Sequence, residues 1–123
     1  MVRVNDAVFD AYVRRAIDAL PTLFAELLER VPVIVDRRPS RELRETVEHA
    51  DELLGLYLGP SIDEWDHPET PPETAVIFLF REALEDACDT RRELGEQIAI
   101  TLRHELGHAL GFDEDGLDRI GLA

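Results

Sequence analysis

The sequence contains no lysine, a single cysteine and no long run of apolar residues. All 13 basic residues are arginines, and they are outnumbered by 27 aspartates and glutamates, so the formal net charge is −14 at pH 7. A chain this acidic is repelled by phosphate backbones and anionic lipid headgroups, which argues against nucleic acid and membrane as partners. No stretch approaches the run of about eighteen apolar residues that a membrane-spanning helix requires.

The cysteine content and the first residues indicate a reducing compartment. Cys88 has no partner for an internal disulfide, and the helical pattern around it favours a packed side chain over a nucleophile. The chain begins M-V-R-V-N-D, which carries charge early and lacks the apolar core of a signal peptide. We therefore expect a cytoplasmic protein.

The first third of the chain is predicted to form two helices and a strand. Asn5 or Asp6 can cap a helix over residues 5–19, in which apolar residues recur at three- and four-residue spacing. Pro21 suits the first turn of a second helix. The short β-branched segment 32–35 then predicts a buried strand.

The middle of the chain is less regular. Residues 40–52 are charged and only weakly periodic, which fits either a surface helix or a loop, and residues 53–60 predict a second strand that ends in a turn. Four of the seven prolines fall within residues 60–73, which are predicted to form an exposed loop. Trp65 in that loop is expected to pack back on the core rather than to line a binding surface.

The last part of the chain carries the clearest elements. Residues 74–80 predict a strand, and residues 81–88 predict a short helix. Thr90 and Glu93 form a capping box that opens a longer helix, which runs to about Leu110. At 123 residues, 45% of them hydrophobic, the chain is expected to form one domain over residues 1–123 with a buried core.

The longer helix contains the run H-E-L-G-H, from His104 to His108. Positions i and i+4 lie on the same face of a helix, so His104 and His108 can direct two imidazoles at one metal ion. Glu105 lies beside that face, where it can take a proton from a water. The alternative is a surface helix that carries two histidines by chance, but the whole chain has only four. The pattern therefore predicts a zinc site.

The residues after the motif offer a third ligand. Gly111 can adopt the left-handed conformation that ends a helix, and Glu114 lies three residues beyond it. Glu114 is the first candidate, and its neighbours Asp113, Asp115 and Asp118 are the alternatives. Without the histidines, the same residues would be a helix cap followed by a solvated acidic tail. The two remaining histidines are expected at the surface, at His49 and His67.

The run from His104 to Glu114 resembles the zincin metallopeptidases, and most closely their small bacterial, minimal zincin-like family. Residues 53–59 are also similar to a segment of that family. The resemblance implies a compact α/β (α+β) fold, in which helices pack on a small mixed sheet of about three strands. It also implies zinc bound by His104, His108 and Glu114, with Glu105 as the general base.

The resemblance further implies a zinc-dependent peptidase that hydrolyses peptide bonds. Residues 75–80 are similar to the edge strand that pairs with extended substrate in larger zincins, and an unpaired edge can add a peptide as an extra strand. In thermolysin-like relatives the third ligand lies on a distant second helix, which would fall past Ala123, so we expect a third ligand that is nearby or comes from upstream in the chain.

Two departures from larger relatives favour an alternative function. The only methionine is Met1, which excludes the methionine turn of the metzincins, and few residues follow Glu114 to build the lower half of a deep cleft. A zinc-binding interaction module with little or no catalysis is therefore the alternative. An acidic helical adaptor without metal is a third interpretation.

Overall fold

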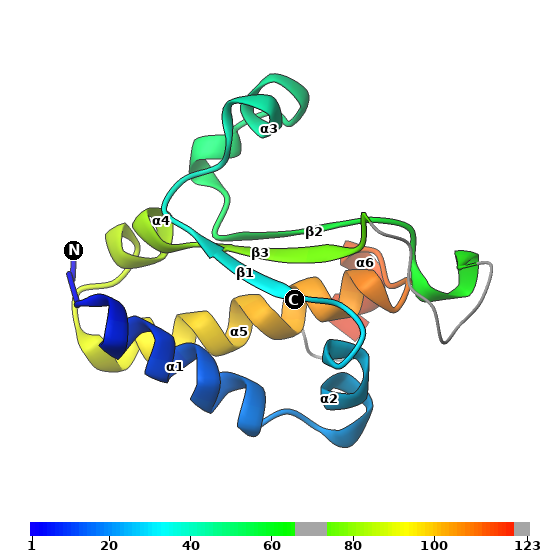
Figure 1. Ribbon diagram of the computed structural model, residues 1–123, viewed down its shortest axis with the longest axis horizontal. Helices are drawn as coiled ribbons and strands as arrows, with labels where there is room; N and C mark the ends of the chain where they lie inside the picture. Colours follow the sequence, from blue (N-terminus) through cyan, green and yellow to red (C-terminus); the bar gives the residue numbers. More distant parts are fainter. Residues whose placement is uncertain (66–73, 120–123) are drawn as a thin grey trace.

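The sheet of the protein is mixed and three-stranded. The computed structural model describes residues 1–65 and 74–119, and its strands are β1 (Val33–Asp36), β2 (Gly55–Leu58) and β3 (Val76–Phe80). They lie in the order β1-β3-β2 (Figure 1). The central β3 pairs in parallel with β1 and antiparallel with β2. The expected small mixed sheet is confirmed.

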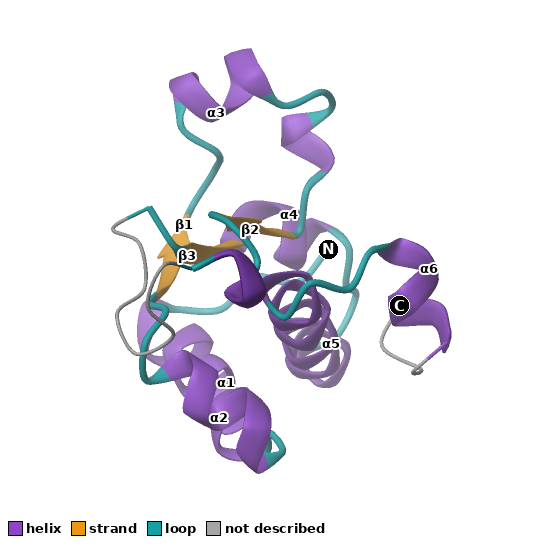
Figure 2. Cartoon of the chain, turned by 90° about the vertical axis from the view of Figure 1, so that its right-hand side faces the viewer, coloured by secondary structure: helices purple, strands orange, loops and turns teal. Residues whose placement is uncertain are grey.

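Helices cover mainly one face of this sheet. They are α1 (Asp6–Asp18), α2 (Thr22–Leu28), α3 (Arg41–Thr46), α4 (Arg81–Asp86), α5 (Arg91–Ala109) and α6 (Glu114–Arg119). Figure 1 and Figure 2 show α5 running along the sheet with α1 and α2 on the same side, whereas α3 stands on the opposite side. The predicted α+β arrangement, with the motif helix packed on the sheet, is therefore confirmed.

The core lies between α5 and the sheet. The predicted apolar face of α5 is fully buried, as are its partners on α1 and β3; these residues are Phe9, Ile77, Leu79, Ile98, Leu102, Leu106 and Ala109. Each large apolar side chain buried in this way contributes about 1.5–3 kcal/mol. The burial fixes the rotation of α5 about its axis, and this rotation decides where the motif residues point.

The expectation that residues 75–80 present an unpaired edge is wrong. β3 is the central strand, with β1 on one side and β2 on the other. Its sequence V-I-F-L-F is apolar at every position, and the alternate residues Ile77 and Leu79 are fully buried, as is Phe80. The edges belong to β1 and β2. The prediction of a buried strand at residues 32–35 is also wrong in part, because β1 lies at an edge of the sheet and Ile34 is 41% exposed.

Several local predictions can be compared with the structure. The Asn5 side chain accepts a hydrogen bond from Val8 N–H at 2.9 Å, which confirms the cap of α1. Trp65 is buried, and its indole N–H donates to the Pro60 carbonyl at 3.1 Å, which confirms that it packs on the core. Cys88 is also buried, although it lies after the end of α4 rather than within it.

The structure also shows the conformation of residues 40–52 and the position of His49. Residues 40–52 form the short helix α3 and a 3-10 turn, Ala50–Glu52. His49 lies on the surface, as expected, whereas His67 falls outside the described residues. None of the helices in residues 1–65 and 74–119 combines the length and apolar character of a membrane span.

Gly95 gives a first testable expectation. It lies within α5, and a Cβ added there would meet only Tyr12 Cγ, at 4.0 Å. Glycine costs a helix interior about 0.5–1 kcal/mol relative to alanine. Gly95→Ala is therefore expected to raise the free energy of unfolding by that amount, measured by chemical denaturation. A loss of stability would show that α1 and α5 are packed more tightly here than the structure indicates.

Candidate metal site

Helix α5 brings the two motif histidines together. The Thr90 side chain caps the helix by accepting a bond from Glu93 N–H at 3.1 Å, as the capping box predicts. The helix then continues unbroken through the motif to Ala109. His104 Nε2 and His108 Nε2 lie 3.2 Å apart on one face. One turn of helix thus places both imidazoles side by side, as the spacing predicts.

The end of α5 reverses the chain. Gly111 has φ of 98°, and its N–H donates to the His108 carbonyl at 2.9 Å. Phe112 N–H donates to the Gly107 carbonyl at 3.0 Å. These two bonds are the pair that defines a Schellman turn, in which glycine supplies the left-handed residue. The predicted turn at Gly111 is present, and it directs the following residues back along the motif face.

The reversed chain enters α6, a helix that sequence reasoning missed. Asp113 Oδ1 accepts a bond from Gly116 N–H at 2.7 Å, and the Asp113 carbonyl accepts one from Leu117 N–H at 2.9 Å. Asp113 therefore acts as the cap of α6, and Glu114 is its first residue. An aspartate followed by an acidic first turn is a known start signal, and it could have been recognised in the sequence.

The carboxylate of Glu114 completes a cluster with both histidines. Glu114 Oε1 lies 3.1 Å from His104 Nε2 and 3.0 Å from His108 Nε2. Ligand atoms bonded to one tetrahedral zinc at about 2.0–2.2 Å are about 3.3–3.5 Å apart. The three atoms are within a few tenths of an ångström of that spacing. Two imidazole nitrogens and one carboxylate oxygen are also a donor set that zinc prefers. The residues therefore fit the ion that the motif implies.

The hydrogen bonding of the His108 ring also suits a metal ligand. His108 Nδ1 lies 2.9 Å from the Phe112 carbonyl, which can only accept a hydrogen bond. The ring proton is therefore assigned to Nδ1, which leaves the lone pair on Nε2, the nitrogen that lies beside His104 Nε2 and Glu114 Oε1. Metal-binding histidines usually donate their second ring N–H to such an outer acceptor. Because this acceptor is a backbone atom, no residue type could have indicated it in the sequence.

Glu105 lies beside the histidines but is buried. It is 7% exposed, and its Oε1 accepts a bond from Tyr57 N–H at 2.8 Å. Its Oε2 lies 3.9 Å from His104 Nε2. Burial raises the pKa of Glu105, while the Tyr57 bond and the two histidines oppose that rise. The carboxylate thus has one oxygen fixed and one directed toward the histidines.

Two carboxylates therefore compete for the place beside the imidazoles. His104, Glu105 and His108 offer ligand atoms within 4.8 Å of one another, so they could themselves hold a metal ion. Glu114 fits better as a ligand, because one of its oxygens lies about 3 Å from both nitrogens and is not engaged by a backbone amide. Asp113 is engaged as a cap, and among the described residues neither Asp115 nor Asp118 brings an oxygen within 4.0 Å of either imidazole.

Gly107 controls the approach of α6 and gives a second expectation. A Cβ at this position would lie 2.2 Å from Leu117 Cδ2, and Leu117 is fully buried. Gly107→Ala should push α6 away, cost about 1–3 kcal/mol of stability and weaken zinc binding about 10–100-fold by displacing Glu114. Denaturation and zinc titration would measure both effects.

A double-mutant cycle provides the control for this expectation. In a Leu117→Ala background the clashing methyl group is absent, so adding Gly107→Ala should then have little effect on zinc affinity. An equal loss of affinity in both backgrounds would show that the contact between Gly107 and α6 does not set the position of Glu114.

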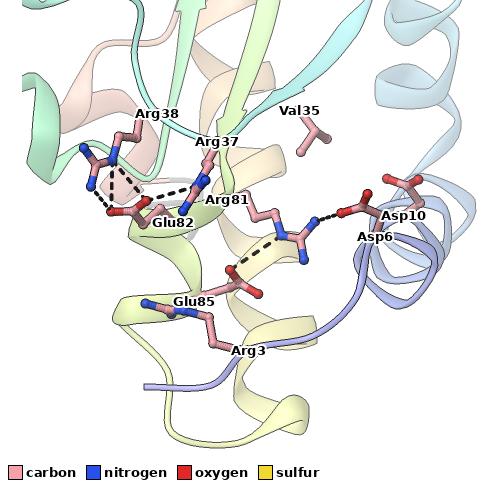
Figure 3. Close-up of a pocket in the computed structure, with 9 residues that line it drawn as sticks. All are labelled: Arg3, Asp6, Asp10, Val35, Arg37, Arg38, Arg81, Glu82 and Glu85. Carbon is pink, nitrogen blue, oxygen red and sulfur yellow. Dashed lines mark hydrogen bonds and ion pairs between the residues drawn. The ribbon is translucent and has the colours of Figure 1, made fainter.

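A cavity of about 720 Å³ lies away from this site, near the N-terminal segment and α4 (Figure 3). Arg81 pairs there with Asp6 and Glu85, while Arg38 bonds Glu82 at 2.7–3.0 Å. These charges neutralise one another, and no motif residue lines the cavity. The network fastens the N-terminal segment to α4, and the candidate site is at the other end of α5.

Comparison with known protein families identifies the family of this chain. A family model described as zincin-like metallopeptidase matches residues 28–122, which is well over half of the chain. The matched range includes the three strands, the motif helix and α6, whereas α1 precedes it. No curated protein matches the chain significantly.

Proposed function

This chain belongs to the zincin-like metallopeptidase family, and from that premise we propose that it is a zinc-dependent peptidase. The observation that carries the proposal is the convergence of His104, His108 and Glu114 within 3.0–3.2 Å, next to the buried carboxylate of Glu105. The three converging side chains would hold the ion. Glu105 would serve as the general base.

Zinc, when bound, polarises a substrate carbonyl and lowers the pKa of a coordinated water to about 7. The protein contributes the proton transfers. Glu105 Oε2 faces the histidines, so it can take a proton from the attacking water and later return it to the departing amine nitrogen. Glu105 Oε1 stays with the Tyr57 amide, which keeps the carboxylate from rotating away.

The proposed substrate is a peptide that lies along β2 rather than β3. β2 is an edge strand, and its Tyr57 N–H is engaged by Glu105, so an extended peptide that pairs with the other outward backbone groups of this edge would pass the site. Acidic side chains gather near the turn at Gly111: Asp63 Oδ1 would be 3.3 Å from a Cβ at Gly111, and Asp113 and Asp115 follow it. Their charge favours a basic peptide.

The test combines metal content with cleavage. Protein purified without chelator should contain about one zinc per chain and should cleave members of a peptide library. A chelator should stop the cleavage, and added zinc should restore it. Cleavage that survives complete removal of metal would exclude the proposed chemistry.

A zinc-binding interaction module is the second candidate, and one observation favours it. The side chain of Glu114 is 68% exposed, and those of His104 and His108 are 24% and 28% exposed, so the site is open to solvent. Peptidase sites usually exclude water when substrate is bound. A stoichiometric zinc content together with a silent library would support this second function over the first.

A further inference from the structure

The backbone amide of Tyr57 has an unusual partner for its place in the sheet. Tyr57 lies opposite Ile77 in the antiparallel pair, and the Leu54 carbonyl accepts a bond from Phe80 N–H. Antiparallel strands alternate between inward and outward backbone groups, so the Tyr57 N–H points away from β3. Such an edge amide ordinarily bonds to water. Here it donates to Glu105 Oε1 at 2.8 Å, across 48 residues of sequence.

Gly55 makes this contact sterically possible. A Cβ at Gly55 would lie 2.7 Å from Thr101 Cγ2 and 2.9 Å from the Phe78 carbonyl oxygen. It would also lie 3.5 Å from Glu105 Cγ. Any side chain at this position would therefore force β2 and α5 apart. The absence of a side chain lets the strand lie close enough for its amide to reach the carboxylate.

The contact matters because Glu105 is itself close enough to become a metal ligand. Its Oε2 is 3.9 Å from His104 Nε2, and it shares a possible ligand cluster with both histidines. A carboxylate that binds the ion directly is a weaker proton acceptor, because the cation draws electron density from it, and so it serves less well as a general base. The fixed oxygen limits how far Glu105 can rotate toward the imidazoles.

We infer that the Tyr57 amide, brought within reach by Gly55, is a positioning group that holds Glu105 out of the metal's ligand set and leaves that place to Glu114. The consequence for hydrolysis rests on the proposed function. The contact itself and its effect on the choice of metal ligands do not depend on the proposed function. They can be tested even if the protein cleaves no peptide.

Amide hydrogen exchange in the metal-free protein tests the contact. Glu105→Ala should accelerate exchange at Tyr57 by about tenfold or more, because hydrogen bonds to charged groups are among the stronger ones. Exchange at Ile77, whose N–H bonds the Pro32 carbonyl at 3.0 Å, should not change. Glu85→Ala is the matched control, because Glu85 is also buried and accepts Val4 N–H at 3.0 Å. It should affect Val4 and not Tyr57.

A pair of substitutions at Tyr57 tests the effect on the metal. Tyr57→Ala removes the ring and keeps the N–H, whereas Tyr57→Pro removes both, and proline is tolerated where an edge N–H points outward. With cobalt(II) as the probe, the alanine variant should keep the wild-type visible spectrum. The proline variant should still bind one cobalt per chain but show the weaker absorption of a higher coordination number. Its peptide hydrolysis should fall about tenfold or more below that of Tyr57→Ala.

Unchanged exchange at Tyr57 in Glu105→Ala, or identical cobalt spectra for the two folded Tyr57 variants, would overturn the inference. If the proline variant does not fold, Gly55→Ala replaces it, with Gly95→Ala as the control for an alanine at an unhindered glycine. A wild-type protein that cleaves nothing would count against the proposed function alone, because exchange and spectra still decide the role of the amide.

Discussion

Glu105→Gln is expected to retain about one zinc per chain and to slow peptide hydrolysis by about 10²–10⁴-fold, the usual contribution of a general base. The amide keeps the shape of the carboxylate and can still accept the bond from Tyr57 N–H, but it has little ability to take a proton. Zinc content and the rate of cleavage of one library substrate, measured on the same preparation, would show whether hydrolysis is lost while metal binding is kept.

Protein stability should not fall in this variant. Burial raises the pKa of Glu105, which means that the charged form is disfavoured where it lies. A neutral side chain of the same shape relieves that cost. The matched control is Glu85→Gln, which places the same change at a carboxylate that is equally buried but belongs to the network of Arg81. Glu85→Gln should change the free energy of unfolding and leave the rate of peptide hydrolysis at the wild-type value. A Glu105→Gln variant with the wild-type rate would refute the assigned base.

The double substitution His104→Ala, His108→Ala is expected to abolish zinc binding. Two of the three converging ligand atoms are lost, and the remaining carboxylate of Glu114 is mostly exposed. Zinc at 100 times its dissociation constant should stabilise the wild type by about 2.7 kcal/mol, and this increment should vanish in the variant. Metal analysis and thermal unfolding with and without added zinc would measure both effects.

The chain provides its own control for histidine removal. His49 lies on the surface, with its side chain 76% exposed, so His49→Ala should retain the metal and the zinc-dependent rise in unfolding temperature. If the double variant still held one zinc per chain with the same stabilisation, the ion would occupy another site and the motif would be an ordinary part of α5.

The parts of the site that the sequence predicted are local ones. A helical repeat of 3.6 residues is enough to place His104 beside His108, and a glycine that follows the motif is enough to predict the turn at Gly111. The position of Glu114 three residues beyond that glycine made it the first candidate for the third ligand. The structure brings all three side chains together, and the metal itself remains a prediction.

The parts that the sequence missed depend on distant residues or on backbone atoms. The apolar pattern identified β3 as a strand, but strand order depends on pairing between segments that are far apart, so residues 75–80 were wrongly placed at an edge. The bonds from Tyr57 N–H to Glu105 and from His108 to the Phe112 carbonyl use backbone groups that every residue type carries. The need for glycine at Gly55 arises only once β2 and α5 are in contact.

The candidate ligands are close in sequence, whereas the proposed base, Glu105, is held by a residue far away in the sequence. His104 and Glu114 are ten positions apart, but the bond that fixes Glu105 joins positions separated by 48. Closing a short loop costs less entropy than closing a long one, and local contacts form earlier during folding. During folding the three candidate ligands would therefore come together before the Glu105 carboxylate is fixed in place. The orientation of Glu105 would follow only when β2, which carries the Tyr57 amide, packs against α5.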